Sequence, residues 1–342
     1  MTVHVPSPVS MAERVRGAKV LVTGGFGFIG AWFAHLLLDR GNSVVLLDNG
    51  DYAGSTAAAL GLAEHPDVSV HLGDVRSAET FAFLGDSFDY IVHAAGFLGI
   101  RRVVEQPVNT LDINYVGTQQ CLDFAVRQRD LKRLIVFSTS EVYGRQAIDV
   151  GENSPVVVDV DSLRWGYAAG KIAAEFLAMA YRAEHRLPVV IVRPFNVYGP
   201  YRRGSNAMTT LVDCALRGRP LRISGDGEQR RSWCYVTDLT HALEGLLLHP
   251  DAVGERFNMG NDLADVSMVE LARLIIGHTN SHSPLQITGS SEPDVRLRKP
   301  DIDKARLLIG YEPAVDVMSG IRLVVEARRE ELATTRPTGA VA

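Results

Sequence analysis

Six short apolar segments recur along the first 195 residues, and stretches long enough for a helix separate them. The segments span 19–24, 43–49, 68–74, 90–96, 133–140 and 188–194. Helical patterns lie between them at 29–39, 108–128 and 167–184. Regular alternation of strands and helices predicts a parallel sheet with helices on both faces. The expected fold class is therefore α/β, a doubly wound parallel sheet whose ligands bind beyond the carboxyl ends of its strands.

This alternation stops after Pro194. Loops rich in Gly, Arg and Ser then separate helices that are expected near 207–217, 237–248 and 267–276. We predict a first domain over 17–195, to which 233–258 returns, and a smaller C-terminal lobe over 196–232 and 259–332. Residues 1–16 and 333–342 lack such patterns and are predicted to be flexible termini.

The composition argues against several classes of partner. The formal net charge of −5 shows no basic excess, so no nucleic acid is expected to bind. No stretch reaches the ~18 apolar residues of a membrane span, and no signal-peptide core is evident. The three cysteines (Cys121, Cys214 and Cys234) lie far apart and lack metal-ligand spacing. We expect a soluble, cytoplasmic protein without a metal site and without a membrane partner.

The turn after the first expected strand is rich in glycine. Gly24, Gly27 and Gly30 have the spacing GxxGxxG just before a helix. Glycine lets the backbone approach a pyrophosphate, which the N–H groups and positive dipole of the helix start then hold. Phe28 and Ile29 belong to the same predicted site. A glycine-rich turn without any ligand is the alternative.

Later strand ends extend this predicted dinucleotide site. Asp48 ends the second strand, where a carboxylate accepts both ribose hydroxyls of an adenosine and repels a 2′-phosphate, which favours NAD over NADP. Asp74 ends the third strand and is either an adenine contact or a surface turn residue. The fourth strand ends in small residues. These either let the backbone pass close to the nicotinamide or simply allow a helix to pack against the sheet. The predicted cofactor-binding residues of these strand ends are Asp48, Asn49, Asp74, Val75, Ala94, Ala95 and Gly96.

Tyr167 and Lys171 are four residues apart on an expected helix and so share a face. A phenol has a reference pKa of about 10, but a nearby ammonium and an oxidised nicotinamide both favour its phenolate. Tyr167 can then take a hydroxyl proton as a hydride leaves for the cofactor. Such a pair is common by chance, and its support comes from the order of the motifs along the chain.

With these residues assembled, the sequence resembles the extended short-chain dehydrogenase/reductase family, the NAD-dependent nucleotide-sugar epimerases, dehydratases and decarboxylases. The resemblance runs from about Lys19 to about Glu331. It includes RPFNVYGP (193–200), GDGEQRRSWCYVTDL (225–239), FNMGN (257–261) and DIDKARLLIGYEP (301–313). It implies a Rossmann fold, bound NAD, a nucleotide-sugar substrate and transient oxidation of the sugar at C4 to a 4-keto sugar.

The resemblance also implies roles for individual residues. Thr139 matches the residue that hydrogen-bonds the sugar 4-hydroxyl, Tyr167 the base, and Lys171 the residue that orients Tyr167 and the nicotinamide ribose. Tyr167, Lys171 and Pro194 are therefore also expected to contact the cofactor. Asn196 and Arg231 match positions that bind the nucleotide diphosphate.

Two departures from the family pattern concern the diphosphate. Ser232 stands where an Asp often follows that Arg, and Ser291 stands where several epimerases have a further diphosphate-binding Arg. Arg296 or Arg298 is placed in sequence to compensate. Family members commonly dimerise through two helices each, so a homodimer is expected through 108–128 and 167–184.

The strand LIVFSTSEVYG (134–144) ends in the residues that bear on the reaction. Family 4,6-dehydratases carry Thr-Asp-Glu here, whereas this chain has Thr139, Ser140 and Glu141, and serine is a poor proton donor. Simple 4-epimerases tend to carry a small or neutral residue in place of Glu141. The segment resembles the UDP-glucuronate decarboxylases, as do RW (164–165) and RKPDI (298–302), whose Arg298 matches the Arg that those enzymes use beside the carboxylate or as a proton donor.

Oxidation at C4 turns a 5-carboxylate into a β-keto acid, which can lose CO2 with the C4 carbonyl as the electron sink. The hypothesis is that Thr139 and Tyr167 serve the redox step, while Glu141, Ser140 and Arg298 manage the carboxylate and protonation. A UDP-glucose or UDP-glucuronate 4-epimerase, a 4,6-dehydratase and a non-catalytic NAD sensor are the alternatives. Glu141 is otherwise a turn carboxylate, and Arg298 a surface salt-bridge partner of Asp294 or Asp301.

Overall fold

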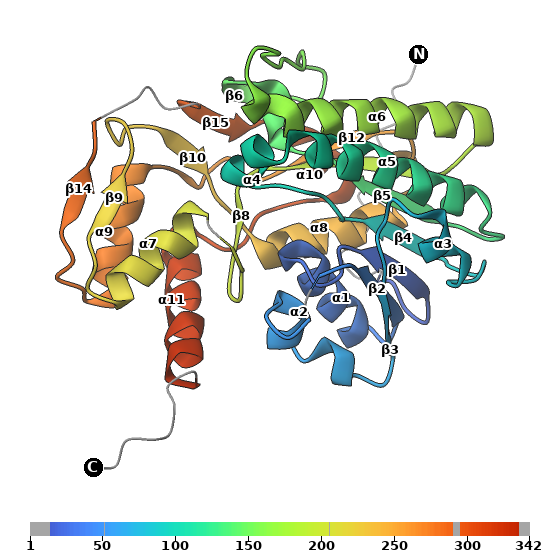
Figure 1. Ribbon diagram of the computed structural model, residues 1–342, viewed down its shortest axis with the longest axis horizontal. Coiled ribbons are helices and arrows are strands. Elements are labelled where there is room, and N and C mark those ends of the chain that lie inside the picture. Colours follow the sequence, from blue (N-terminus) through green and yellow to red (C-terminus); the bar gives the residue numbers. More distant parts are fainter. Residues whose placement is uncertain (1–13, 51, 205, 290–294, 335–342) are drawn as a thin grey trace.

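The structure, a computed structural model, describes residues 14–50, 52–204, 206–289 and 295–334 (Figure 1). A seven-stranded parallel sheet lies at the centre of the first domain, in the order β3-β2-β1-β4-β5-β7-β12. From β1 the chain first adds β2 and β3 on one side and then continues on the other side with β4, so the strand order reverses between β1 and β4. Ligands bind at this point in such folds. This confirms the predicted doubly wound α/β fold. The strands are β1 (Lys19–Thr23), β2 (Ser43–Asp48), β3 (Val68–Leu72), β4 (Tyr90–His93), β5 (Arg133–Phe137), β7 (Val189–Pro194) and β12 (Arg256–Met259).

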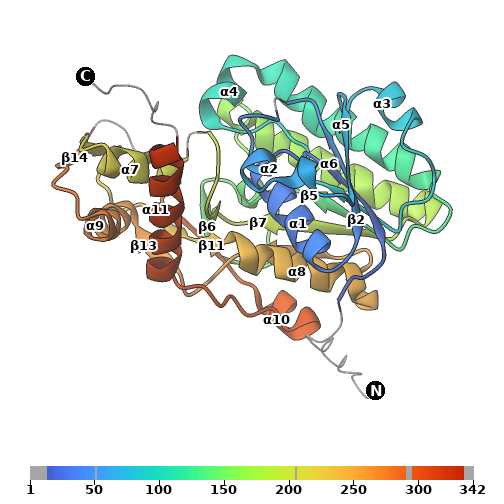
Figure 2. The same cartoon turned by 90° about the horizontal axis from the view of Figure 1, so that it is seen from below.

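Helices cover both faces of this sheet (Figures 1 and 2). One face packs against α1 (Phe28–Asp39) and α8 (Val236–Leu248), the other against α3 (Ala78–Ala82), α5 (Pro107–Val126) and α6 (Gly166–His185). All five residues of β5 are buried, as a strand covered on both sides requires. Shorter elements of the first domain are α2 (Thr56–Ala59), η1 (Leu62–Glu64), α4 (Ile100–Glu105), η2 (Ser140–Tyr143), η3 (Leu163–Trp165) and η4 (Pro250–Ala252).

The lobe packs beside the carboxyl ends of the strands and has a core of its own, which includes Met208, Leu271 and Ile321. Three helices surround that core: α7 (Ala207–Leu216), α9 (Met268–Thr279) and α11 (Val317–Thr334). A four-stranded sheet joins the lobe to the first domain, because it pairs β13 (Asp265–Ser267), β10 (Arg230–Ser232) and β15 (Leu297–Pro300) with β6 (Gln146–Val150). Two-stranded sheets pair β8 (Val197–Tyr198) with β11 (Cys234–Tyr235) and β9 (Leu221–Ile223) with β14 (Leu285–Ile287).

Three parts of the chain pack differently from what the predicted domain ranges imply. Helix α10 (Asp303–Ile309) falls in the predicted lobe, yet its apolar residues join the first-domain core beside α1 and α8. Val15 falls in the predicted terminus 1–16, yet it is buried in that same core. Residues 333–334 end α11. Burial of apolar side chains explains the first two placements, and residues 1–13 and 335–342 lie outside the described ranges.

Candidate active site

The turn between β1 and α1 brings three stretches of backbone close together. Gly24 has a φ of 69° and donates its N–H to the carbonyl of Leu47 (2.8 Å). A Cβ on Gly24 would lie 2.7 Å from the amide nitrogen of Ala95, and a Cβ on Gly30 would overlap the carbonyl oxygen of Gly24. Glycine fits both positions because any side chain would push the turn away from β4 or α1 away from the turn.

The start of α1 suits an anion. The helix begins at Phe28 after Gly27, and within the described chain no side chain caps this end and no acidic residue stands in its first turn. The first N–H groups of a helix lack acceptors inside the helix, and its dipole adds partial positive charge there. The backbone cradle of Gly24, Gly27 and Gly30 therefore fits a pyrophosphate.

Asp48 lies beside this cradle at the end of β2. Its Oδ2 accepts the N–H of Phe26 (3.0 Å) and its Oδ1 accepts the N–H of Gly50 (2.9 Å). These bonds fix the carboxylate at the edge of the turn, next to the exposed Asn49. An ionised carboxylate has further lone pairs for ribose hydroxyls. This arrangement fits the adenosine half of NAD.

Asp74 already has a partner in the protein. The Arg76 guanidinium contacts it through Nη2 (2.5 Å) and Nε (3.0 Å), and this hydrogen bonding holds the pKa of Asp74 below its ordinary value. The N–H of Arg76 also donates to its Oδ1 (2.9 Å), which is the geometry of a turn. An adenine contact from Asp74 stays a prediction. Val75 is buried and packs beside Gly117 of α5.

The end of β4 lies between the glycine turn and α6. Ala94 and Ala95 donate their N–H groups to the carbonyl (3.1 Å) and hydroxyl (3.3 Å) of Thr23. A Cβ on Gly96 would lie 3.3 Å from Nζ of Lys171, so the small residues leave space beside that ammonium. Ile29, Ala94, Gly96 and Pro194 all line the same large cavity as the reacting residues predicted from the sequence.

Thr139 and Tyr167 meet in this cavity. Thr139 follows β5 and begins η2, where its hydroxyl accepts the N–H of Glu141 (3.2 Å). Burial raises the pKa of Tyr167, and the charge of Glu141 raises it further. A hydrogen bond from Thr139 and the charge of Arg202 lower the same pKa. The phenol and the threonine hydroxyl are thus close enough to hold one substrate oxygen between them.

Lys171 follows one helical turn after Tyr167 and is buried. Burial lowers the pKa of Lys171 to about 8, and the Glu175 carboxylate one turn further along α6 opposes this shift. Glu175 is itself held by the Arg193 guanidinium (Nη2–Oε2 2.6 Å) and by the hydroxyl of Ser138 (2.5 Å). The hydrogen bond from Ser138 to Glu175 therefore connects the end of β5 to α6 inside the protein.

Glu141 lies between two guanidinium groups. Its Oε2 is 2.7 Å from Nη1 of Arg164, and its Oε1 is 3.9 Å from Nη1 of Arg298. Arg298 also donates to the carbonyl of Gly144 (3.1 Å) and is buried, which disagrees with a surface salt bridge to Asp301. Asp294, the other expected partner, lies outside the described residues. Ser140 is buried next to Glu141 and lines the cavity.

The two predicted diphosphate residues lie on the lobe side of the cavity. Asn196 has a positive φ of 36°, and its Nδ2 donates to the carbonyl of Ser232 (3.1 Å). Arg231 donates to the carbonyl of Val295 (2.7 Å). Arg296 was one of two residues expected to replace the diphosphate-binding Arg that is absent at Ser291. It pairs instead with Asp226 (2.9 Å) and does not line the cavity. Ser291 lies outside the described residues.

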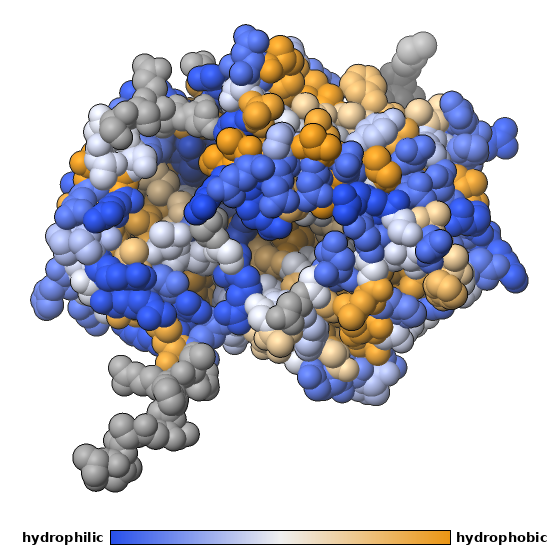
Figure 3. Space-filling view, viewed as in Figure 1, coloured by the Kyte–Doolittle hydropathy of each residue, from blue (hydrophilic) through white to orange (hydrophobic). Residues whose placement is uncertain are grey.

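The cavity itself has a volume of about 670 Å³ and opens between the first domain and the lobe, where the face in Figure 3 is hollowed. Among the described residues that line it, positive charge dominates, since Glu141 is the one carboxylate. A substrate with several negative charges is therefore favoured. The cationic lining residues are Arg164, Lys171, Arg202, Arg222, Arg231 and Arg298.

Sequence reasoning did not assign Arg202 to the site. Its Nη1 donates to the carbonyl of Val197 (2.5 Å), and its guanidinium lies 5.2 Å from the ring centroid of Phe28. Arg202 follows RPFNVYGP, one of the motifs that carry the family resemblance. Loop residues have no periodicity from which the direction of a side chain could be predicted. Two arginines of α4, Arg101 and Arg102, do not line the cavity, and Arg101 pairs with Glu105 (2.7 Å).

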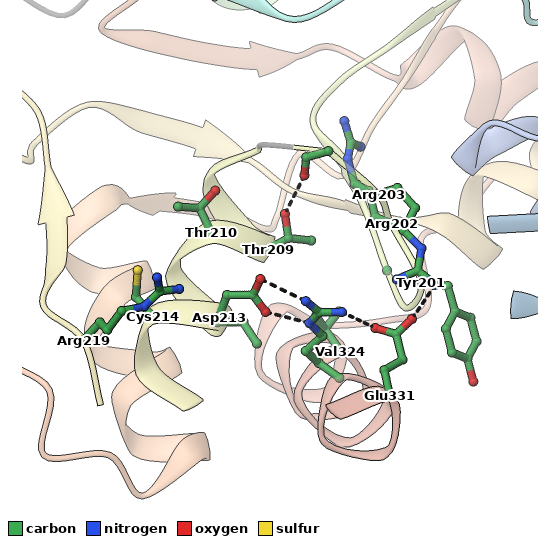
Figure 4. Close-up of a pocket in the computed structure, with 14 residues that line it drawn as sticks. Tyr201, Arg202, Arg203, Thr209, Thr210, Asp213, Cys214, Arg219, Val324 and Glu331 are labelled. Atoms are coloured by element: carbon green, nitrogen blue, oxygen red, sulfur yellow. Dashed lines mark hydrogen bonds and ion pairs between the residues drawn. The ribbon is translucent and has the colours of Figure 1, made fainter. Parts of the chain in front are cut away.

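A second cavity, of about 290 Å³, shares Arg202 with the first (Figure 4). Arg328 of α11 pairs there with Asp213 of α7 (2.6 Å) and with Glu331 (2.7 Å), and Glu331 also pairs with Arg203 (3.0 Å). These ion pairs attach α11 to the rest of the lobe. None of the site residues predicted from the sequence lines this cavity.

Comparison with known proteins gives consistent matches. The model of the NAD dependent epimerase/dehydratase family matches residues 20–260. UDP-glucuronic acid decarboxylase 2 of Arabidopsis thaliana is 33% identical, over 95% of this chain and 71% of that protein. UDP-N-acetyl-alpha-D-glucosaminuronate decarboxylase of Bacillus cytotoxicus is 31% identical, over 91% of this chain and 98% of that protein.

Solved structures match as well. The UDP-glucuronic acid 4-epimerase of Bacillus cereus, in complex with UDP-glucuronic acid and NAD, superposes with a TM-score of 0.82 at 25% identity. That match covers 92% of this chain and 99% of the epimerase. Across the described ranges, no helix combines the length and the apolar character needed to cross a membrane.

Proposed function

The chain belongs to the NAD-dependent epimerase/dehydratase family, as the resemblance predicted, and from this premise we propose that it decarboxylates UDP-glucuronate. Its cofactor is NAD, and it is a nucleotide-sugar-modifying enzyme. One observation carries the finer proposal: Glu141 lies between Arg164 and Arg298 in the cavity that also contains Thr139 and Tyr167. These charged groups are suited to a sugar with a carboxylate at C5.

The first step would oxidise the C4 hydroxyl of the sugar. Tyr167 removes the hydroxyl proton, helped by the Lys171 ammonium, while Thr139 hydrogen-bonds the same oxygen and fixes its direction. When bound, NAD would supply a hydride acceptor, and after reduction a hydride donor, for C4 of the sugar. The glycine turn, Asp48 and Lys171 would hold NAD in place for this transfer.

The second step would break the bond between C5 and the carboxylate. The C4 carbonyl accepts the electron pair, and its oxygen is then hydrogen-bonded by Thr139 and by Tyr167, which now carries the proton. CO2 leaves, and C5 takes up a proton to give the 4-keto pentose. We assign this proton delivery to Arg298, and we assign to Ser140, a poor proton donor, hydrogen bonding of the substrate carboxylate. Reduction at C4, with the Tyr167 proton returned to oxygen, completes a UDP-pentose.

Glu141 favours loss of CO2 over its retention. A protein carboxylate beside the substrate carboxylate raises the free energy of that group by like-charge repulsion, and release of neutral CO2 relieves it. An epimerase that rotates the 4-keto sugar gains nothing from such a carboxylate. Dehydration lacks its acid, because Ser140 replaces the Asp. The Arabidopsis and Bacillus cytotoxicus relatives are both named as uronate decarboxylases, which supports the same choice.

The test incubates the NAD-loaded protein with UDP-glucuronate and analyses gas and nucleotide products by mass spectrometry. The proposal expects CO2 and a UDP-pentose, and neither from the Tyr167→Phe variant. Formation of UDP-galacturonate without CO2 would establish a 4-epimerase instead. Absence of any change in cofactor absorbance with any nucleotide sugar would favour a sensor.

We further propose that the protein is a homodimer. Exposed apolar side chains lie along α5 at 108, 111 and 115, one face of the helix, and Phe176 is exposed on the adjacent α6. Helices α5 and α6 pack against each other in this chain, so two such pairs can form a four-helix bundle. We propose that this surface binds the same surface of a second copy of the chain.

A further inference from the structure

A buried carboxylate lies behind the reacting residues. Tyr167, Lys171 and Glu175 are spaced four residues apart on α6 and so lie along one face of the helix. Tyr167 and Lys171 line the cavity, whereas Glu175 does not line it and is buried in the protein. A buried carboxylate is costly unless it is paired and hydrogen-bonded. The groups that bind Glu175 therefore indicate what it does.

Glu175 is bound by groups from three neighbouring strands. Ser138, which directly follows β5, donates its hydroxyl to Oε1 of Glu175 (2.5 Å). Arg193 of β7 donates to both carboxylate oxygens, from Nε to Oε1 (2.8 Å) and from Nη2 to Oε2 (2.6 Å). Nε of Arg256 on β12 lies 3.3 Å from Oε2. Bidentate pairing with Arg193 fixes the orientation of the carboxylate.

The same cluster holds both ends of the turn that carries Thr139. Ser138 immediately precedes Thr139, so the bond from Ser138 to Glu175 fixes the start of this turn. Tyr143 ends η2, and its hydroxyl oxygen accepts from Nη1 of Arg193 (2.8 Å). One connection thus runs to Glu175 itself, and the other runs to the arginine that Glu175 binds. The turn is thereby attached to α6 through Glu175.

We propose that Glu175 is a positioning residue for oxidation at C4, because it anchors the turn that carries Thr139 to the helix that carries Tyr167. These two hydroxyls must meet at one sugar oxygen, and they come from different elements. A fixed link between the elements sets the separation of the hydroxyls, and a misplacement of about 1 Å can cost about 100-fold in rate. This inference rests on the proposed function, since it assumes that the C4 hydroxyl binds at Tyr167.

Glu175 also acts on Lys171 through its charge. Burial lowers the pKa of Lys171 to about 8, and the Glu175 carboxylate opposes this shift. His93 faces Lys171 from β4 and is neutral, because burial lowers its pKa to about 3. Asn114 of α5, on the other side of Gly96, does not titrate. Loss of the Glu175 charge should therefore lower the pKa of Lys171 further.

The experiment first removes the anchor and keeps the charge. Ser138→Ala deletes one hydroxyl and leaves Glu175 paired with Arg193. NAD-loaded protein is mixed with UDP-glucuronate in a stopped-flow instrument, and NADH formation is followed by absorbance. The rate of this step should fall about 10- to 100-fold, while the Kd of UDP-glucuronate changes less than about 3-fold. Ser138→Thr retains a hydroxyl and should restore most of the rate.

A matched control is Tyr181→Phe. Tyr181 of α6 donates its hydroxyl to Oδ1 of Asp123 on α5 (2.6 Å), and it does not line the cavity. This variant loses the same kind of hydrogen bond from the same helix, so its rate of NADH formation should stay within about 2-fold of wild type. Circular dichroism and NAD content check that each variant is folded.

Two further measurements separate positioning from a general loss of structure. Crystallography of NAD-bound Ser138→Ala should show the Thr139 hydroxyl farther from the Tyr167 phenol than in wild type. The rate of NADH formation should decline at high pH as Lys171 loses its proton. This decline should move to lower pH in Glu175→Gln and stay in place in Ser138→Ala.

An unchanged rate in Ser138→Ala, or a slow variant with unchanged spacing of the two hydroxyls, would overturn the proposal. If Glu175→Gln does not fold, the rate and spacing in Ser138→Ala still decide. NADH formation without release of CO2 would refute the proposed decarboxylation and leave the role of Glu175 intact. A wild type that forms no NADH with any nucleotide sugar would refute the proposed function, and the crystallographic spacing would then decide alone whether Glu175 positions Thr139.

Discussion

Lys171 is an ammonium in a largely dry position, and this makes the stability of the protein depend on pH. Burial lowers the pKa of Lys171 from its ordinary value of 10.5 to about 8. The unfolded chain therefore holds this proton more tightly than the folded chain does. The contribution of Lys171 to the free energy of unfolding is fully present above pH 10.5 and is lost as the pH falls through 8.

This pH dependence can be isolated with Lys171→Met, which removes the titrating group. The free energy of unfolding of wild type minus that of the variant should rise between pH 8 and 10.5, by on the order of 3 kcal/mol, and stay flat below pH 7. Urea unfolding of NAD-free protein at several pH values measures the difference. Parallel pH curves for the two proteins would show that Lys171 keeps its ordinary pKa.

Arg202 gives a second prediction at the residue scale. Its positive charge lowers the pKa of Tyr167, and its own pKa, lowered by burial to about 10, leaves it charged at neutral pH. Arg202→Met should raise the pKa of the phenol and move the ascending limb of kcat/KM against pH upward, by on the order of half a unit to one unit. Arg202→Lys should restore the limb.

The neighbouring Arg203 provides the control for this experiment. It pairs with Glu331 (3.0 Å) in the second cavity, so Arg203→Met should leave the pH profile of the enzyme unchanged. A shift of the same size in both variants would mean that the loop, and not the charge of Arg202, controls Tyr167.

The predicted reacting residues Thr139, Tyr167 and Lys171 meet in the structure for reasons the sequence contains. A polar residue directly after a buried strand lies at the sheet edge, and two helix positions four apart share a face. The contact of Arg164 with Glu141 and the position of Arg202 had no such signal. Both arginines lie outside long regular elements, where residue spacing does not determine direction.

At the scale of elements, the turn between β1 and α1 depends on Gly24 in two separable ways. Its φ of 69° is unfavourable for other residues, and a Cβ there would lie 2.7 Å from the amide of Ala95. Gly41, with a φ of 77°, has the same conformational need but no atom within 4 Å of the Cβ position. Comparing alanine at the two sites therefore separates backbone strain from the clash.

Both Gly24→Ala and Gly41→Ala should lower the free energy of unfolding by about 1–2 kcal/mol from the left-handed backbone alone. Only Gly24→Ala should also weaken NAD binding, by more than about 10-fold, because the turn must move away from β4. Thermal unfolding of the NAD-free proteins and titration with NAD measure the two effects. Similar NAD affinity in both variants would contradict a tight cradle at Gly24.

The secondary-structure elements that could be predicted are those with a clear pattern of apolar residues. The six predicted strands of the sheet, from 19–24 to 188–194, and the helices between them are long apolar patterns, and each matches an element of the structure. Helices α10 and α11 were not assigned. The strands β10, β13 and β15 are three or four residues long and rich in charged residues. Pairing across the chain, not local pattern, makes them strands.

At the scale of the whole molecule, the position of the cavity depends on contacts between distant parts of the sequence. β15 of the lobe pairs with β6 of the first domain, which brings Arg298 next to Glu141 although they are far apart in the chain. The family resemblance suggested that both residues act together. The sequence alone contains no spacing from which this distance follows.

The proposed dimer is a property of the assembled surface, and it can be tested there. Phe176 is 69% exposed on α6, and burial of such a ring in a second copy would stabilise a four-helix bundle, whereas a buried, unpaired carboxylate would oppose it. Phe176→Glu should therefore convert the dimer to monomer at micromolar concentration. Leu263→Glu alters an even more exposed side chain, at 86%, on the lobe and should leave the dimer intact. Sedimentation velocity measures both, and a wild-type monomer, or a dimer that survives Phe176→Glu, would rule out this interface.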